Sequence, residues 1–315
     1  MMRKPVWCSW QLTDACNFRC AFCSVWKKDK SEEKDQTLEE IERSAERLSR
    51  MGTMVVSMTG GEPLLRKDLP DIIRAVGRYH FPFISTNGSL VTPEMARNLA
   101  EAGLWGIGVS LDYADATRHD AARGHEGAFD KAVNALRLLQ NARIKKRPQV
   151  NMMITLMHDN LDDIPKLADL ATDIGCNFRV QAYSTLKTGD TERIYPKPVS
   201  KTLLDLHRQY PNFVTNPVVL EKFDQALTGG VPGCIAGRYM VNIDPRGNVS
   251  KCPEDQAHPV GHILKNDAKT LCSRLKEMHR TNTCKACWYN CRNELEVCYS
   301  FRGMFHGGTQ NFRRR

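Results

Sequence analysis

The chain has 315 residues, 41% of them hydrophobic and 26% charged, which is ordinary for a globular protein and allows one large domain with a smaller appendage. It has no apolar run of about 18 residues and no apolar stretch directly after Met1–Lys4. We therefore expect a cytoplasmic protein without a transmembrane segment. The net charge of +9 and the Arg313–Arg315 end favour an acidic protein, a nucleic acid or an anionic lipid as partner, and a generally basic surface accounts for them equally.

Short apolar strands alternate with amphipathic helices from Val6 to about Ala182, which predicts a parallel α/β fold. The expected strands are Val6–Gln11, Met54–Met58, Phe83–Ser85, Gly106–Leu111, Val150–Thr155 and Phe178–Ala182. Thr37 and Glu40 have the spacing of a capping box, so the first helix begins after Thr37. Later helices are expected at Leu69–Tyr79, Pro93–Ala102, Ala128–Ala142 and Leu161–Ile174. The alternation alone does not separate an open doubly wound sheet from a barrel.

Three cysteines with the spacing C-x3-C-x2-C, Cys16, Cys20 and Cys23, follow the first expected strand. A cubane iron–sulfur cluster normally takes four thiolates, so three leave one iron open to a substrate or cofactor. On spacing alone, zinc binding and structural thiols are alternatives. The chain has twelve cysteines in clusters and no export signal, which favours metal binding over disulfides.

The second motif is the segment Met54–Pro63, in which an apolar strand leads to Gly60, Gly61 and Glu62. Together with the cysteine triplet it resembles the radical S-adenosylmethionine (SAM) enzymes. The resemblance implies a partial (β/α)6 TIM-like barrel, with a 4Fe–4S cluster on the three cysteines and the SAM amino group at the glycine turn. Glycines allow close backbone approach and Glu62 offers an acceptor to an ammonium group. The same resemblance implies that Phe18 and Phe22 shield the cluster.

Polar residues at the ends of the later strands complete the expected SAM site, because α/β barrels carry their sites at the carboxyl ends of the strands. The residues that the resemblance places against SAM are Thr86, Asn87, Ser110, Asp112 and Asn151. The segment His119–Phe129 looks like the loop before the fourth helix of peptide-modifying members. In it, Arg123 is expected to bind the SAM carboxylate in two-point fashion, with a structural ion pair as the alternative. Turn or helix-cap roles are the alternative for the polar residues.

A cysteine-rich region begins at about Gly229, where the alternation stops. Met240–Cys252 predicts a hairpin with its turn at Asp244–Gly247, and a helix is expected over Ala268–His279. We therefore divide the chain into a barrel domain of residues 1–228, with its core at 5–185, and an auxiliary domain of residues 229–315.

This region resembles the SPASM/twitch extensions of the same superfamily, which hold auxiliary iron–sulfur clusters. The resemblance assigns one 4Fe–4S cluster to Cys234, Cys252, Cys284 and Cys287. The full SPASM pattern C-x2-C-x5-C-x3-C is not present, since the chain has only C-x2-C-x3-C. Cys291 is an alternative ligand, or joins Cys272 and Cys298 in a second site, and zinc is the alternative metal. Cys8 and Cys176 are expected to be buried thiols.

The resemblance implies a reductive cleavage of SAM to a 5′-deoxyadenosyl radical that abstracts a hydrogen atom from an unactivated carbon. We expect an oxygen-sensitive oxidoreductase that receives electrons from a flavodoxin or a ferredoxin-type protein. The first interpretation is oxidative modification of a ribosomal peptide or protein side chain. Because the barrel begins within about five residues of Met1, the leader-binding domain of many peptide maturases is expected to be absent.

Two further interpretations stay open, namely oxidation or rearrangement of a small metabolite (an aminoglycoside, a cofactor precursor or a lipid) and a non-catalytic cluster carrier. An oxidation releases a proton that needs an acceptor, ideally a carboxylate in a dry site. Glu254 and then Asp255 are the expected bases, because both follow Cys252 directly; a solvated acidic turn is the alternative.

Overall fold

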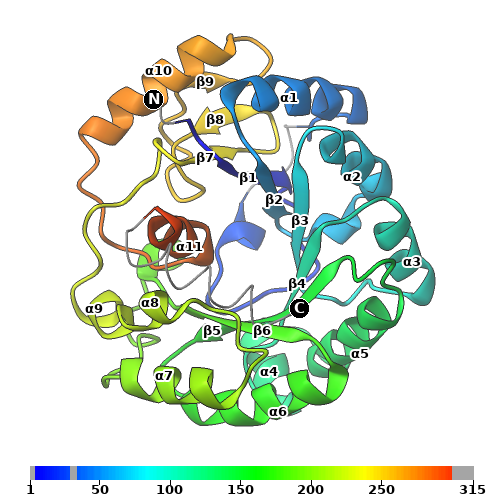
Figure 1. The fold of residues 1–315 in the computed structure, drawn as a ribbon, viewed down its shortest axis with the longest axis vertical. Helices are drawn as coiled ribbons and strands as arrows, with labels where there is room; N and C mark the ends of the chain where they lie inside the picture. Colours follow the sequence, from blue (N-terminus) through cyan, green and yellow to red (C-terminus); the bar gives the residue numbers. More distant parts are fainter. Residues whose placement is uncertain (1–3, 29–33, 300–315) are drawn as a thin grey trace.

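The computed structural model describes residues 4–28 and 34–299. Its strands are β1 Trp7–Thr13, β2 Val55–Gly60, β3 Phe81–Thr86, β4 Gly106–Ser110, β5 Gln149–Leu156, β6 Asn177–Ala182, β7 Met240–Ile243, β8 Asn248–Ser250 and β9 Gly261–His262. They form one nine-stranded sheet in the order β6-β5-β4-β3-β2-β1-β7-β8-β9. Strands β1 to β6 are parallel and curve around a common centre (Figure 1). The partial barrel expected from the sequence is confirmed, and each of the six expected strands is present.

The helices that follow the barrel strands cover the outside of the sheet (Figure 1). They are α1 Leu38–Met51, α2 Leu69–Gly77, α3 Pro93–Glu101, α4 Ala116–Arg123, α5 Ala128–Asn141 and α6 Ile164–Ile174, with the 3-10 turns η1 Val25–Lys27, η2 Pro63–Leu65, η3 Leu161–Asp163 and η4 Thr185–Lys187. The capping box at Thr37 is present. The Thr37 side chain accepts from the Glu40 amide, and the Glu40 carboxylate accepts from the Thr37 amide. Helix α4 is an element that the sequence pattern did not predict.

The core between the sheet and these helices explains why the strands are apolar. The sheet side contributes Trp10, Val56, Ile84, Ile107 and Met152, all of which are fully buried. Strands β1 and β4 are buried almost throughout, whereas β2, β3 and β6 alternate buried with more accessible residues, because successive side chains point to opposite faces of a strand. The periodicity of the sequence therefore predicts this part of the fold well.

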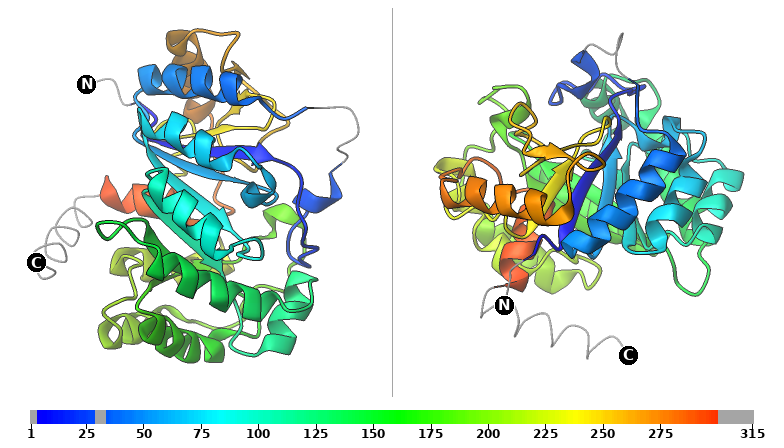
Figure 2. Two further views of the ribbon diagram at one scale, coloured as in Figure 1. Left: turned by 90° about the vertical axis from the view of Figure 1, so that its right-hand side faces the viewer. Right: turned by 90° about the horizontal axis from the view of Figure 1, so that it is seen from above.

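The C-terminal region continues the barrel sheet. After α7 Ser200–Gln209, α8 Pro217–Leu220 and α9 Phe223–Thr228, strand β7 pairs in parallel with β1, with Trp7 opposite Met240. The expected hairpin is present as β7 and β8, and β9 extends it in antiparallel fashion. Helix α10 Ala268–Arg280 then packs beside α1 (Figure 2), and α11 Asn290–Cys298 follows. The boundary at residue 228 stays a prediction.

The last helix lies on the inner side of the strand arc, close to β6 (Figure 1). Arg179 on β6 donates to Glu294 on α11 at 2.7 Å, an ion pair of which both side chains are about one quarter exposed. A segment 115 residues away in sequence thus closes part of the barrel interior.

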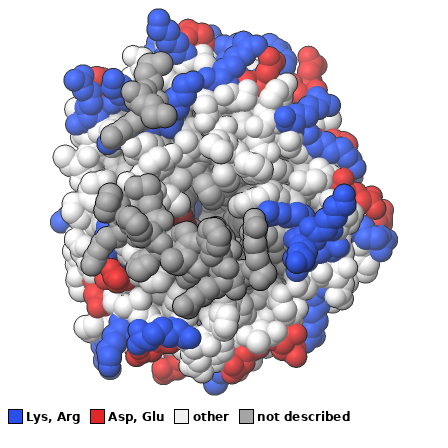
Figure 3. Space-filling model, viewed as in Figure 1, with Lys and Arg blue, Asp and Glu red and all other residues white. Residues whose placement is uncertain are grey.

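The described part of the chain contains no helix that is long and apolar enough to cross a membrane. On the face drawn in Figure 3, Lys and Arg are intermixed with Asp and Glu around the edge. Oppositely charged side chains also form exposed ion pairs, such as Arg50–Glu46 and Arg74–Asp71.

Candidate active site

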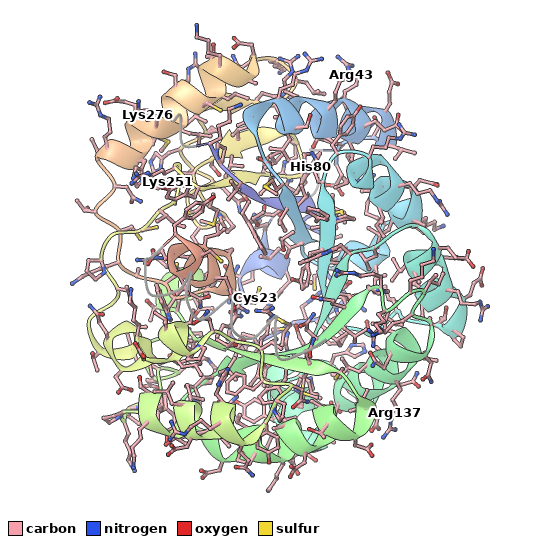
Figure 4. The ribbon with its side chains drawn as sticks, viewed as in Figure 1. Cys23, Arg43, His80, Arg137, Lys251 and Lys276 are labelled. Carbon is pink, nitrogen blue, oxygen red and sulfur yellow. The ribbon has the colours of Figure 1, made fainter. Side chains whose placement is uncertain are left out.

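A cavity of about 240 Å³ opens at the carboxyl ends of the barrel strands. Its lining brings together Cys16, Phe18, Cys20, Phe22, Cys23, Val25, Thr59, Gly60, Gly61, Glu62, Ser85, Thr86, Asn87, Ser110, Arg123, Thr155, Gln181, Tyr183, Ser184, Lys187 and Tyr289. Figure 4 shows Cys23 near the centre of the strand arc. The three cysteines, the glycine turn and four of the polar residues expected from the sequence therefore face one space.

The loop that carries the three cysteines is held against α4. The amide of Arg19 donates to the Arg123 carbonyl at 3.3 Å and that of Ala21 donates to the Ala122 carbonyl at 3.0 Å. Phe18 is buried and its ring stacks on His125 with centroids 4.3 Å apart. Burial raises the pKa of the Cys20 thiol. Cys16, Phe22 and Cys23 pack against the buried residues Phe18, Cys20 and Ala128, and the shielding of a cluster by Phe18 and Phe22 stays a prediction.

The two glycines of the turn are required by the chain itself. A Cβ at Gly60 would overlap the Thr13 carbonyl, and one at Gly61 would overlap the Ala15 carbonyl. The amide of Gly61 donates to Thr13 at 2.8 Å and that of Glu62 donates to Ala15 at 2.7 Å. The end of β2 thus lies directly on the start of the cysteine loop. The glycines thus allow a close approach between two backbone segments, whereas the motif predicted the close approach of a ligand.

Glu62 is almost fully buried and its carboxylate is already oriented. It accepts from the Thr86 hydroxyl at 2.7 Å, the Asn87 amide at 2.8 Å and the Leu64 amide at 3.0 Å. Burial raises the pKa of Glu62 in spite of these bonds. A carboxylate has about four acceptor sites, so three donors leave about one for a further donor in the cavity. The residue fits an ammonium group at this position.

Arg123 and Asp112 form a buried ion pair. The Arg123 Nε and Nη2 atoms donate to Asp112 Oδ2 at 2.9 Å and 2.5 Å. Burial alone would lower the pKa of Arg123, but the Asp112 carboxylate and the Cys20 thiol raise it above the usual value. Arg123 lines the cavity, whereas Asp112 is fully buried behind it and also accepts from the Thr155 amide at 2.8 Å.

Asn151 is an expected site residue that does not reach the cavity. Its side-chain amide donates to the carbonyls of Ile107 at 3.2 Å and Gln149 at 3.1 Å, and Arg179 approaches its oxygen at 3.4 Å. It is buried and is not among the residues that line the cavity. Its contacts tie β4, β5 and β6 together in the barrel interior.

The wall of the cavity opposite the glycine turn was not anticipated. Thr155 and Gln181 stand at the ends of β5 and β6, where the rule of strand ends would have indicated them. Lys187 on η4 carries no such signal. Its ammonium lies 3.1 Å from the Glu254 carboxylate, in a pair whose side chains are 32% and 14% exposed. The Ser184 hydroxyl donates to the Ala286 carbonyl at 3.0 Å.

These contacts place the cavity next to the auxiliary cysteines. Ala286 lies between Cys284 and Cys287, and Glu254 follows Cys252 by two residues. Tyr289 lines the cavity as well, and burial raises the pKa of its hydroxyl. The cysteine-rich region therefore contributes Tyr289 to the cavity wall and contacts the wall residues Ser184 and Lys187.

Neither Glu254 nor Asp255 is among the residues that line the cavity, and only Glu254 pairs with a lining residue, Lys187. Asp255 pairs instead with Lys251 at 3.0 Å and with His258 at 2.7 Å. Burial would raise its pKa, but the hydrogen bonds from His258 and Lys251 outweigh burial and lower it. Its carboxylate is therefore a weaker base than an ordinary aspartate.

Five cysteines gather at the C-terminal site. Cys234 packs in a small cluster with Ile235 and Tyr239, and Cys252, Cys284 and Cys291 pack against this cluster. Cys287 interacts electrostatically with Cys234, Cys252 and Cys291. A hydrogen bond from the Cys234 thiol lowers the pKa of Cys284. Soft thiolates at this density fit an iron–sulfur cluster.

The remaining cysteines lie apart from this group. Cys272 packs on the main core from α10, and Cys298, at the end of α11, is exposed and interacts with Glu294 and Arg179. Cys8 and Cys176 are buried, as expected, and burial raises the pKa of both thiols. All twelve cysteines are among the described residues and none is in a disulfide.

Within residues 4–28 and 34–299, no three His, Cys, Asp or Glu side chains are arranged to hold a single metal ion.

Comparison with known proteins relates this geometry to families. The model of the Radical SAM superfamily matches residues 10–171. The chain is 29% identical to mycofactocin maturase MftC of Mycolicibacterium smegmatis over 95% of this chain and 80% of that protein. It is 39% identical to Fe-coproporphyrin III synthase of Methanosarcina barkeri over 53% of this chain and 41% of that protein.

Solved structures share the fold. Streptococcus suis SuiB bound to its precursor peptide SuiA superimposes with a TM-score of 0.71 at 16% identity, over 91% of this chain and 70% of that one. The anSMEcpe enzyme with bound AdoMet and the Cp18Cys peptide superimposes with a TM-score of 0.67 at 17% identity, over 94% and 87% of the two chains.

Proposed function

The chain belongs to the radical SAM superfamily, and from this premise we propose that it is a maturase that oxidises a side chain of a ribosomal peptide or protein. The observation that carries the proposal is the cavity, which has the residues of a SAM site on one wall and borders the auxiliary cysteines at the other. Radical generation and electron removal would then take place on two sides of one substrate.

We assign the SAM-binding 4Fe–4S cluster to Cys16, Cys20 and Cys23, and the SAM amino group to Glu62 at the turn of Gly60 and Gly61. When bound, the reduced cluster supplies the electron that cleaves SAM to methionine and a 5′-deoxyadenosyl radical, which removes a hydrogen atom from the substrate. Thr86 and Asn87 orient Glu62 for this task. Ser110 and Arg123 face the same space, and Arg123 is the proposed partner of the SAM carboxylate.

Two other residues act through their neighbours in this assignment. Asp112 neutralises and positions Arg123 rather than touching SAM. Asn151 holds three strands together below the site. Both were expected to contact SAM, and we now propose positioning roles for them.

We assign an auxiliary 4Fe–4S cluster to Cys234, Cys252, Cys284 and Cys287, with Cys291 as the alternative ligand beside them. After the hydrogen atom is lost, the substrate radical must lose one electron and one proton to become a crosslink or a double bond. The auxiliary cluster, if held by these cysteines, would supply an acceptor for the electron, and Ser184, Lys187 and Tyr289 in the cavity wall lie beside the segments that would hold it.

We propose Glu254 as the acceptor of the proton, reached through the amine of Lys187 in the cavity wall. Lys187 donates a proton to Glu254 at 3.1 Å and takes the substrate proton in its place, so the total charge of the pair rises by one. Asp255 is the second candidate base, but the hydrogen bonds that it accepts from His258 and Lys251 lower its pKa and oppose this role.

The peptide substrate class is supported by a relative that matches most of the chain and is named as a mycofactocin maturase. A second candidate, supported by the 39% identity of the barrel half to an Fe-coproporphyrin III synthase, is oxidation or rearrangement of a small metabolite. We propose that a flavodoxin or ferredoxin-type protein of the cytoplasm supplies the first electron in either case.

Deuterium transfer separates the two substrate classes. Reduced protein and SAM are incubated anaerobically with a perdeuterated cell extract divided into a peptide fraction and a small-molecule fraction. Deuterium in 5′-deoxyadenosine from the peptide fraction is the expected result, and deuterium from the small-molecule fraction alone would favour the second candidate. A protein that forms no 5′-deoxyadenosine in any fraction would be a cluster carrier, contrary to the proposal.

A further inference from the structure

Arg292 is a buried cation at the auxiliary cysteine site. It lies on α11, one residue after Cys291, and its side chain is 0% exposed. An arginine is charged at every accessible pH, so a full positive charge is held inside the protein at this position. Burying such a charge is costly unless it is paired and hydrogen-bonded. The contacts of Arg292 therefore need an explanation beyond local stability.

The guanidinium joins two of the three backbone segments that carry the proposed ligands. Nη2 donates to the Val231 carbonyl at 2.6 Å and to the Pro232 carbonyl at 3.2 Å, just before Cys234. Nη1 donates to the carbonyl of Cys287 at 2.8 Å. The cation also lies over the ring of the buried Trp288, 5.4 Å from its centroid. The positive charge of Arg292 is thus held beside the segments that carry the proposed cluster ligands.

Glu296 is the counter-charge. Its carboxylate accepts from Arg292 Nε at 2.6 Å and is 11% exposed, so the pair is shielded from solvent. The charges of a shielded pair interact more strongly with neighbouring groups than those of an exposed pair, because the local dielectric constant is lower.

We propose that Arg292 is a positioning residue that raises the reduction potential of the auxiliary cluster, and that Glu296 limits this effect. Reduction adds one negative charge to a site that already carries thiolates, and a fixed cation beside it stabilises the more negative state. A higher potential makes the cluster a better acceptor for the electron of the substrate radical. The inference rests on the proposed auxiliary cluster at Cys234, Cys252, Cys284 and Cys287.

The test is a potentiometric titration of the auxiliary cluster, followed by electron paramagnetic resonance. The C16A/C20A/C23A protein is the parent, because it retains only the auxiliary cluster. Arg292→Gln should lower the midpoint potential so that the reduced-to-oxidised ratio at a fixed potential falls about tenfold, which is about 59 mV for one electron. Glu296→Gln should shift the midpoint in the opposite direction, because it removes the negative partner.

Two controls separate charge from packing. Arg292→Lys keeps the charge and should stay closer to the parent than Arg292→Gln. Arg280→Gln removes an exposed cation of α10, whose side chain is 70% exposed, and should leave the midpoint unchanged. If Arg292→Gln does not load a cluster, the upward shift of Glu296→Gln alone supports the proposal.

The inference is overturned if both Arg292→Gln and Glu296→Gln leave the midpoint of the parent unchanged, or if both shift it in the same direction. Iron analysis distinguishes this failure from that of the proposed function. A parent that binds no iron at all overturns the auxiliary cluster itself, and the role of Arg292 with it.

Discussion

The two halves of the active site are held together in different ways. The SAM half is built where neighbouring parallel strands end, and its parts contact each other through backbone groups, as in the bonds of Gly61 to Thr13 and of Glu62 to Ala15. The auxiliary half depends on side chains that reach distant segments, such as Arg292 to Val231 and Ser184 to Ala286. A site of the first kind is readable from short motifs, whereas one of the second kind is not.

Removal of a charge partner in the SAM half should have the largest effect on stability. Asp112→Asn leaves the Arg123 cation buried without its counter-charge, and we expect a loss of about 3–5 kcal/mol in the free energy of unfolding. Urea-induced unfolding of the anaerobically purified protein measures the loss. Asp71→Asn, which breaks the exposed pair with Arg74, should cost less than about 1 kcal/mol. Equal losses in the two variants would show that burial of the pair is unimportant.

Acid should weaken the same half through His119. This side chain is buried and accepts from the Asp112 amide at 3.3 Å, and burial lowers its pKa to about 4. Its unfolded pKa is near 6.5, so the unfolded state binds the proton first and the stability is lost as the pH falls from about 6.5 to 4. We expect a loss of about 3 kcal/mol over this range.

Comparison with His119→Gln isolates this contribution. The difference in unfolding free energy between the wild type and the variant should shrink as the pH falls from neutral towards 4. Parallel pH profiles would mean that His119 is protonated equally in the folded and unfolded states, contrary to its buried position.

Glu62 tests whether the glycine turn binds SAM. Glu62→Gln keeps the size of the side chain but removes the charge offered to an ammonium group, and SAM affinity should fall by roughly 1.5–3 kcal/mol. Equilibrium binding of SAM to the anaerobic protein measures the change. Glu94→Gln, an exposed position on α3, serves as the matched control. If Glu62→Gln binds SAM as the wild type does, the turn has a structural role alone.

A substitution in the glycine turn tests its close approach to the cysteine loop, and its expected effect on stability is smaller. Gly61→Ala introduces a Cβ onto the Ala15 carbonyl and should destabilise the protein by roughly 1–3 kcal/mol while disturbing the cysteine loop. Gly229→Ala, where a Cβ meets nothing within 4 Å, should be neutral within about 0.5 kcal/mol. Unfolding free energies and iron content of the two variants decide between a packing role and an ordinary turn.

The parts of this structure that the sequence predicts are those with local signals. The capping box of Thr37 and Glu40, the six barrel strands and the cavity positions of Cys16, Gly60 and Thr86 all follow from short-range patterns. Asp112 follows the end of β4 and Asn151 lies near the start of β5, and neither is among the residues that line the cavity, because their side chains bond to Arg123 and to the Ile107 carbonyl. Which polar side chain at a strand end is free for a ligand depends on tertiary partners.

The auxiliary half shows the limit of local patterns. Strand β7 is four residues long and pairs with β1, more than 220 residues earlier, so no local feature indicates that the sheet continues. Lys187 and Arg292 have no motif around them, and their positions depend on Glu254 and Val231 in other segments. Cysteine spacing indicates the ligands but not the charges beside them.

The central claim is that one cavity serves two cluster sites, of which the Cys16, Cys20 and Cys23 site alone cleaves SAM. The most direct measurement is the 5′-deoxyadenosine formed from SAM by the dithionite-reduced proteins under anaerobic conditions. The wild type and C234A/C284A/C287A should form it, and C16A/C20A/C23A should form none while it keeps about four irons. Formation of 5′-deoxyadenosine by C16A/C20A/C23A would contradict the account.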